Sequence, residues 1–101
     1  MHARNAQILL VDDELDSREW MRRTLRQEGY ELREASCGAD AVALIEKYAI
    51  DCVVSDQRMP KMNGLELLER ARIVRPDSVR LLLTGHAEAG PQYSCHCNRT
   101  R

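Results

Sequence analysis

Residues 51–64 read DCVVSDQRMPKMNG, a short apolar run that ends on a carboxylate and passes into a loop. The run at 51–55 is typical of a strand buried on both faces of a sheet, because such strands carry continuous rather than alternating apolar residues. Pro60 and the Asn63-Gly64 pair are turn signals, so a loop is expected directly after Asp56. Asp56 is therefore expected at the carboxyl end of a buried strand.

The rest of the chain alternates short β-rich runs with helical patterns. Four strands are expected at 7–11, 31–35, 51–55 and 79–83, and three helices at 15–28, 36–48 and 65–74. Connections of this length in a βαβαβαβ order make right-handed crossovers. The sequence thus predicts the α/β class, with a doubly wound parallel sheet and helices on both of its faces.

The composition limits the kinds of function that the chain can have. With 101 residues, 44% hydrophobic and 31% charged, the chain is expected to form at most one globular domain. A net charge of -1 argues against a nucleic-acid-binding face, which needs a concentrated basic excess. No apolar run is long enough for a membrane span and no signal peptide is recognised, so a cytoplasmic location is expected.

Carboxylates gather where the expected strands end. Asp12 and Asp13 follow the first strand, Asp56 follows the third, and Thr84 follows the fourth. Ligands of open parallel sheets bind beyond the carboxyl ends of the strands, so these side chains are expected at one edge. Carboxylates that close repel one another unless a cation compensates them, and Mg²⁺ takes such oxygen ligands. With the metal bound, Asp56 can act as a nucleophile that forms an acyl phosphate, and the Thr84 hydroxyl can stabilise the transferred charge.

Each of these residues also has a purely structural explanation. Asp12 or Asp13 alone could be the N-cap of the following helix. Asp56 alone could be a turn residue before Pro60, and Thr84 an ordinary residue at a strand end. Their joint occurrence at strand ends, in this order, favours a functional site.

Three segments together resemble the receiver domain of two-component response regulators. They read ILLVDDE at 8–14, VVSDQRMPKMNG at 53–64 and LLLTGHA at 81–87. The resemblance covers roughly residues 7–88, and its pattern Asp-x-x-Met-Pro-x-Met-x-Gly is highly specific. It implies a flavodoxin-like fold and phosphorylation of Asp56 by a phosphohistidine on a partner, either a sensor histidine kinase or a phosphotransfer protein.

The resemblance also implies the metal ligands. Asp13 and Asp56 would bind Mg²⁺ directly, together with the backbone carbonyl of Arg58. Asp12 would hold the metal through a water molecule.

Further roles implied by the resemblance concern the switch and the lifetime of the acyl phosphate. Thr84 would bind a phosphoryl oxygen and shift inward as the switch. Arg58 and His86 lie at positions where receivers tune the hydrolysis of the acyl phosphate. The chain would be a phosphoacceptor with at most slow autodephosphorylation, not an enzyme, and it would control an output domain outside residues 1–101.

The chain departs from the family at its C-terminal end. Receivers carry a lysine at the end of a fifth strand, followed by a fifth helix, whereas the two lysines here are Lys47 and Lys61. The expected sheet therefore has strand order 2-1-3-4, with the fifth strand and fifth helix missing. Residues 1–88 would form an incomplete receiver, and residues 89–101 a disordered, irregular tail that is truncated or altered relative to the family.

Two consequences of this departure are expected. Without a fifth strand, Val79–Leu83 would be an exposed apolar edge, and such edges invite self-association with another chain. The Cys95-His96-Cys97 run offers three metal ligands, but structural zinc sites space their ligands more widely and use a second pair. A metal site in the tail is therefore not expected.

Two other functions compete with phosphoryl acceptance. A pseudo-receiver, which would be an interaction or dimerisation module that is never productively phosphorylated, is favoured by the missing lysine and fifth strand. An aspartyl-phosphate hydrolase of another fold would require an Asp-x-Asp pair after the first strand, which Asp12-Asp13 does not provide. The intact set of acidic residues favours the phosphoacceptor.

Overall fold

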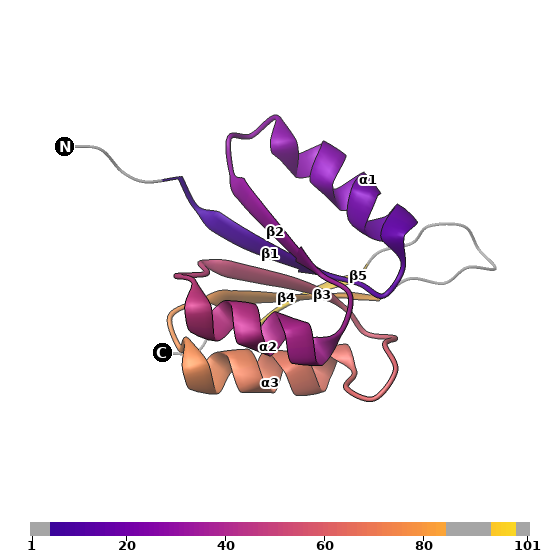
Figure 1. Cartoon of the computed structure of the whole chain (residues 1–101), viewed down its shortest axis with the longest axis vertical. Coiled ribbons are helices and arrows are strands. Elements are labelled where there is room, and N and C mark those ends of the chain that lie inside the picture. The colour runs from indigo at the N-terminus through magenta and orange to yellow at the C-terminus, as the bar shows by residue number, and fades with distance from the viewer. Residues whose placement is uncertain (1–4, 85–93, 99–101) are drawn as a thin grey trace.

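The computed structural model describes residues 5–84 and 94–98, which form one sheet flanked by helices (Figure 1). The strands are β1 (Gln7–Val11), β2 (Glu31–Ala35), β3 (Cys52–Asp56), β4 (Val79–Thr84) and β5 (Ser94–Asn98). The helices are α1 (Leu15–Arg26), α2 (Gly38–Lys47) and α3 (Gly64–Val74). All four expected strands and all three expected helices are present.

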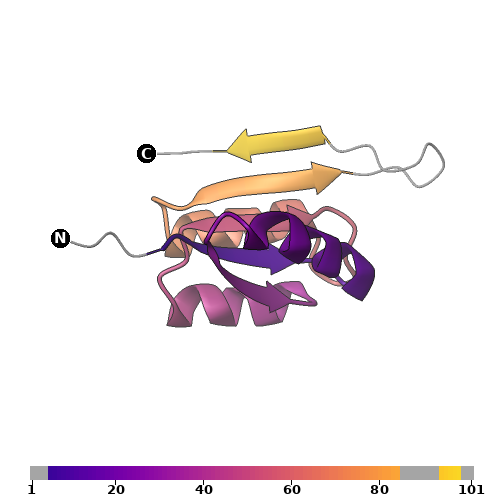
Figure 2. The same cartoon turned by 90° about the horizontal axis from the view of Figure 1, so that it is seen from above.

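The sheet has the order β2-β1-β3-β4-β5, and its first four strands are parallel. This confirms the predicted flavodoxin-like arrangement of strands 2-1-3-4. Helix α1 lies on one face of the sheet, and α2 and α3 lie on the other (Figures 1 and 2). The three crossovers therefore leave the carboxyl ends of β1, β3 and β4 at one edge.

Two apolar cores lie on opposite faces of the sheet, because successive residues of a strand point to opposite sides. On the face covered by α2 and α3, the core includes Leu9, Val11, Val53, Ile45 and Leu67. On the face covered by α1, it includes Ile8, Leu10, Val54 and Met21. Because β1 and β3 contribute to both cores, their continuous apolar runs are explained.

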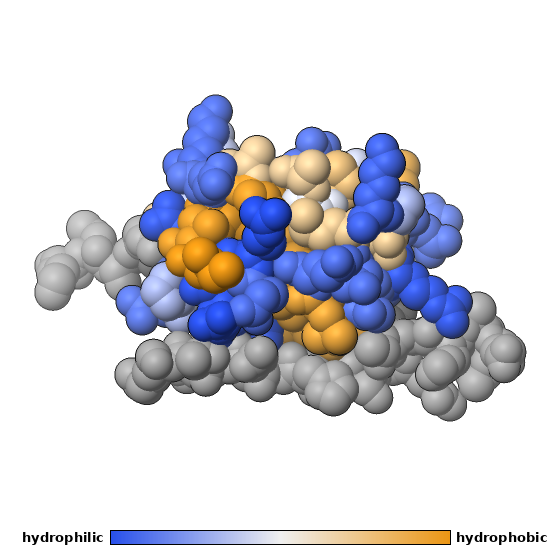
Figure 3. Space-filling model, turned by 90° about the horizontal axis from the view of Figure 1, so that it is seen from below, coloured by the Kyte–Doolittle hydropathy of each residue, from blue (hydrophilic) through white to orange (hydrophobic). Residues whose placement is uncertain are grey.

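The outer surface of α2 and α3 is mixed in character. Figure 3 shows this face with apolar patches separated by hydrophilic side chains. Leu65 and Ile73 of α3 are exposed there among charged neighbours of the same helix. Among the described residues, no helix combines the length and the apolar character that crossing a membrane requires.

The strand β5 differs from the irregular tail expected for residues 89–101. Ser94–Asn98 pairs with β4 in the antiparallel direction, with Thr84 opposite Ser94 and Arg80 opposite Asn98. The two arrows point in opposite directions in Figure 2. The parallel fifth strand and the fifth helix of the family are not found among the described residues.

The pairing of β4 with β5 corrects the expectation that Val79–Leu83 is an unpaired edge. Backbone N–H and C=O groups along such an edge require partners, and a nearby segment can supply them whatever its hydropathy pattern. The segment Ser-Cys-His-Cys-Asn supplies them here. The edge through which self-association was expected is thus paired within the chain.

Candidate functional site

Three carboxylates meet at the carboxyl edge of the sheet. Asp12, Asp13 and Asp56 each place a carboxylate oxygen within 4.8 Å of the others, and we call them the acidic cluster. Asp12 and Asp13 follow β1, and Asp56 is the last residue of β3. The two strands are paired in register, with Val11 opposite Ser55, so their ends lie side by side. The predicted convergence of these side chains is present.

The members of the acidic cluster differ in exposure. Asp12 is buried, Asp56 is half-buried and Asp13 is exposed. Burial, aided by the charges of Asp56, Asp13 and Glu14, raises the pKa of Asp12 to about 6. Burial, together with the charges of Asp13 and Glu14, also raises the pKa of Asp56. The cluster therefore concentrates negative charge at this edge of the sheet.

Backbone hydrogen bonds hold Asp12 in the turn after β1. The N–H of Asp12 donates to the carbonyl oxygen of Ala35 in β2 at 3.2 Å. Its Oδ1 accepts a hydrogen bond from the N–H of Glu14 at 3.0 Å. The N-cap of α1 is Glu14, so neither Asp12 nor Asp13 is the helix cap that was considered as a structural alternative.

The loop after β3 fixes the carboxylate of Asp56. The N–H of Arg58 donates to Oδ2 of Asp56 at 3.1 Å. The Gln57 N–H donates to the carbonyl oxygen of Leu83 at 3.2 Å, and the Gln57 Oε1 accepts from the N–H of Leu65 at 3.0 Å. Gln57 thus ties the loop both to β4 and to the beginning of α3.

Helix α3 begins beside this loop through a capping box. The Asn63 side chain accepts from the N–H of Glu66, and the Glu66 side chain accepts from the N–H of Asn63, both at 2.9 Å. These reciprocal bonds satisfy two backbone donors at the start of the helix. An open pocket beside the acidic cluster is lined by Asp13, Gln57, Arg58, Met59, Pro60 and Asn63.

Of the residues predicted for the site, Thr84 is described only in its backbone and His86 is not described. Thr84 is the last residue of β4, and its neighbour Leu83 is opposite Asp56. The backbone of Thr84 is therefore at the same edge as the acidic cluster. Its hydroxyl group and the whole of His86 lie outside the described part of the chain.

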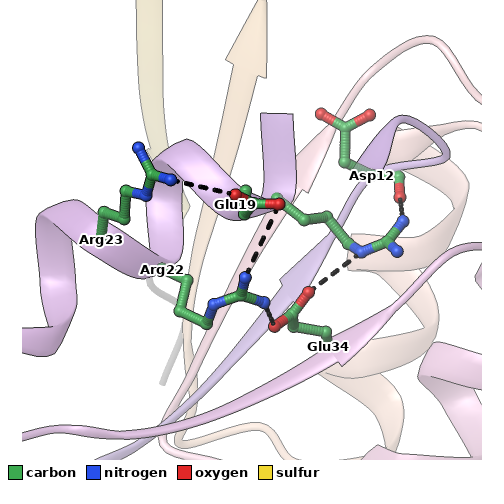
Figure 4. A network of polar contacts seen from close by, with 6 residues as sticks. Asp12, Glu19, Arg22, Arg23 and Glu34 are labelled. Carbon is green, nitrogen blue, oxygen red and sulfur yellow. Dashed lines mark hydrogen bonds and ion pairs between the residues drawn. The ribbon is translucent and has the colours of Figure 1, made fainter. Parts of the chain in front are cut away.

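A network of ion pairs lies next to the acidic cluster, and the sequence did not indicate it. It joins α1 to β2 through Arg18, Glu19, Arg22, Arg23 and Glu34, and we call it the α1–β2 network (Figure 4). Arg18 also donates from Nη1 to the backbone carbonyl oxygen of Asp12 at 2.7 Å. The pairs of Glu19 with Arg22 and Arg23 have helical spacings that could have been read from the sequence, whereas no local pattern indicates the contacts with Glu34.

The donor set of the acidic cluster suits a hard divalent cation. All of its candidate ligand atoms are carboxylate oxygens, which Mg²⁺ prefers over nitrogen or sulfur. A parallel sheet of order 2-1-3-4, with such a cluster beyond β1 and β3, is the architecture of a receiver domain. The comparisons with known proteins agree. The model of the response regulator receiver domain matches residues 8–95, and the chain belongs to this family.

Individual relatives support this assignment. Over 84 residues the chain is 30% identical to sporulation initiation phosphotransferase F of Bacillus subtilis, covering 83% of this chain and 68% of that protein. Over 82 residues it is 39% identical to the hydrogenase transcriptional regulatory protein HoxA of Bradyrhizobium diazoefficiens, covering 81% of this chain but only 17% of HoxA. The chain thus spans less than a fifth of the length of that regulator.

A solved structure shows the same fold. The chain matches the crystal structure of a CheY-like response regulator receiver domain protein from Methanospirillum hungatei with a TM-score of 0.78 and 33% identity. The match covers 83% of this chain and 67% of that one. The chain is therefore a receiver domain of the two-component response regulator type, a class that takes part in phosphorelays.

Proposed function

We propose that Asp56 accepts a phosphoryl group, in an Mg²⁺-dependent step, from a phosphohistidine on a sensor histidine kinase or a phosphotransfer protein. The acidic cluster is the observation that supports this proposal most strongly, since its three carboxylates lie within 4.8 Å of one another. Carboxylates held this close together are unfavourable for folding and useful for binding a cation.

The metal ligands in this proposal are Asp13, Asp56 and the backbone carbonyl of Arg58, with Asp12 acting through water. When bound, Mg²⁺ neutralises the cluster and the charge on the phosphoryl oxygens, and so favours the ionised form of Asp56. The protein's own contribution is orientation. The backbone N–H of Arg58 donates to the Asp56 carboxylate and holds it in place.

The transfer itself is a displacement at phosphorus. A carboxylate oxygen of Asp56 forms a bond to phosphorus as the P–N bond of the phosphohistidine breaks, and the imidazole leaves with the bonding electron pair. The Thr84 hydroxyl is proposed to bind a phosphoryl oxygen of the product. Arg58 and His86 are proposed to control how water reaches the acyl phosphate, so that dephosphorylation is slow.

The output of the chain follows from the same proposal. A receiver signals by changing its contacts with another domain, and the chain covers only a small part of regulators such as HoxA. We infer that phosphorylation of Asp56 controls an output domain that residues 1–101 do not include. The proposed site of action is the cytoplasm, where a phosphohistidine donor would meet the open pocket beside Asp13 and Arg58.

Binding of a phosphoryl mimic tests this proposal. Beryllofluoride is added to the protein with and without Mg²⁺, and bound fluoride is observed by ¹⁹F NMR. Wild type is expected to give bound signals only with Mg²⁺, and Asp56→Asn to give none. The matched control is Asp77→Asn, an exposed carboxylate before β4, which is expected to behave like wild type. The proposal is wrong if wild type gives no bound signal with Mg²⁺. It is also wrong if Asp56→Asn gives the same bound signals as wild type.

A pseudo-receiver remains the second candidate function, supported by one observation. The strand beside β4 is the antiparallel β5, whose sequence Ser-Cys-His-Cys-Asn contains no lysine. The family lysine, which would be a charge-assisted donor to the phosphoryl group, is thus missing from this strand. The same ¹⁹F experiment separates the two functions, because a pseudo-receiver would not form the Mg²⁺-dependent complex at Asp56.

A further inference from the structure

Arg18 of α1 links Asp12 of the acidic cluster to Glu34 of β2. Its Nη1 donates to the carbonyl oxygen of Asp12 at 2.7 Å, and its Nε donates to Oε1 of Glu34 at 3.1 Å. A planar guanidinium presents its donors in a fixed fork, so both bonds hold the side chain in one orientation. Asp12 and Glu34, the two residues that accept these bonds, are labelled in Figure 4.

Glu34, the second acceptor of Arg18, is itself held by another residue. Glu34 accepts from Arg22 through Oε2 as well as from Arg18 through Oε1, so both of its oxygens are used. Glu34 lies in β2 directly before Ala35, whose carbonyl oxygen accepts the N–H of Asp12. The peptide groups on both sides of Asp12 are therefore fixed, one by β2 and the other by Arg18 on α1.

The position of these bonds matters for the site, because Asp12 and Asp13 follow one another in this turn. The carbonyl that Arg18 holds belongs to the peptide bond between them. A rotation of that peptide would move the Asp13 side chain relative to Asp56. The side chain of Arg18 is largely buried, with 15% exposed, and so the bond to the Asp12 carbonyl is shielded from water.

We propose that Arg18 is a positioning residue for the acidic cluster, and that it sets the Mg²⁺ affinity by fixing the peptide between Asp12 and Asp13. The inference rests on the proposed function, since it assumes that the cluster binds Mg²⁺. Removing a residue that hydrogen-bonds to the metal ligands and orients them commonly lowers metal affinity by roughly 10–100-fold.

Orientation rather than charge carries this role. Glu34 compensates the guanidinium of Arg18 through a direct ion pair. A lysine at position 18 would keep the positive charge but could not reach both acceptors with a fixed fork.

Mg²⁺ titration of matched variants tests the inference. Calorimetry with Mg²⁺ alone is done on wild type, Arg18→Met, Arg18→Lys and Arg23→Met. Arg23 lies on the same helix and pairs only with Glu19 among the described residues, so it controls for the loss of a surface ion pair. We expect the dissociation constant to rise by roughly tenfold in Arg18→Met, to rise in Arg18→Lys, and to stay unchanged in Arg23→Met.

Amide hydrogen exchange supplies a second measurement that does not depend on metal. The N–H of Glu14, which donates to Oδ1 of Asp12, is expected to exchange faster in Arg18→Met than in Arg23→Met. If Arg18→Met does not fold, Arg18→Lys carries the same comparison.

The possible results separate the two proposals. If wild type binds no Mg²⁺, the proposed function fails and the inference fails with it. If wild type binds Mg²⁺ and both Arg18 variants bind it with the same affinity as wild type, only the inference is overturned. Wild-type Mg²⁺ affinity in Arg18→Lys, with weaker binding in Arg18→Met, would show that the positive charge at position 18 is responsible. This result would also overturn the inference.

Discussion

A Cβ atom added to Gly64, the first residue of α3, would stand 2.5 Å from the backbone oxygen of Asp56. It would also stand 2.5 Å from Cδ1 of Leu82. Neither distance is compatible with van der Waals contact, and the backbone of β3 cannot move as a flexible side chain can. The glycine of the Met-Pro-x-Met-x-Gly pattern therefore lets α3 begin directly against the end of the strand that carries Asp56.

Gly64→Ala is expected to destabilise the protein. Overpacking against backbone typically lowers the free energy of unfolding by about 1–3 kcal/mol, and here the displaced atom belongs to Asp56 itself. Urea unfolding measures the effect. Leu65→Ala is the control, because this neighbour is exposed and its truncation is expected to change stability by about 0.5 kcal/mol or less. Equal stability of Gly64→Ala and wild type would contradict the close contact.

The metal-free protein is expected to lose stability as the pH rises from about 4 to about 6. Asp12 has a folded-state pKa of about 6 against a usual value of 3.8, so the folded state binds more protons than the unfolded state in this range. Ionisation therefore disfavours the folded state, and the loss is complete above the folded-state pKa. The free energy of unfolding in urea with a chelator, measured from pH 4 to pH 7, checks this.

Asp12→Asn provides the matched comparison for the pH dependence. The amide oxygen can still accept the N–H of Glu14, but it cannot ionise. The variant is expected to be more stable than wild type at pH 7 without metal, and its stability is expected to change less between pH 4 and pH 6. A variant that is less stable at pH 7, or equally sensitive to pH, would contradict the account of the buried carboxylate.

Arg80→Met is expected to keep or increase stability. Arg80 is fully buried in β4, where Nη1 donates to the carbonyl oxygen of Ser78 at 2.9 Å. Within the described structure, its Nε and Nη2 have no hydrogen-bond partner. A buried donor without a partner costs about 1–3 kcal/mol, and methionine removes that cost while filling much of the same volume.

Arg72→Met serves as the control for Arg80→Met in thermal unfolding. Arg72 forms an exposed ion pair with Glu69 on α3, and such pairs contribute about 1 kcal/mol or less. A clear fall in melting temperature for Arg80→Met, beyond that of the Arg72 variant, would show that Arg80 has a stabilising partner.

The four parallel strands and the acidic cluster could be predicted because local sequence determines them. Continuous apolar runs mark β1 and β3, and the residue after each buried run falls at the carboxyl edge of the sheet. The position of Asp56 beside Asp12 and Asp13 follows from that rule alone.

Other features depend on contacts that local patterns do not contain. Arg80 interrupts an apolar strand, and its burial depends on carbonyl oxygens of Pro76 and Ser78 that hydropathy does not reveal. The link from Arg18 to Glu34 joins residues 16 positions apart on different elements. The strand β5 follows from the unpaired edge of β4 rather than from its own composition, and so the tail was expected to be irregular.

The identity of the phosphorylated residue tests the central claim most directly. The protein is incubated with acetyl phosphate and Mg²⁺, and the modified peptide is identified by mass spectrometry after rapid digestion. We expect an acyl phosphate on Asp56 that requires Mg²⁺, is absent from Asp56→Asn and persists in Asp77→Asn. Modification at another residue, or none in wild type with Mg²⁺ present, would contradict the assignment of Asp56 as the phosphoacceptor.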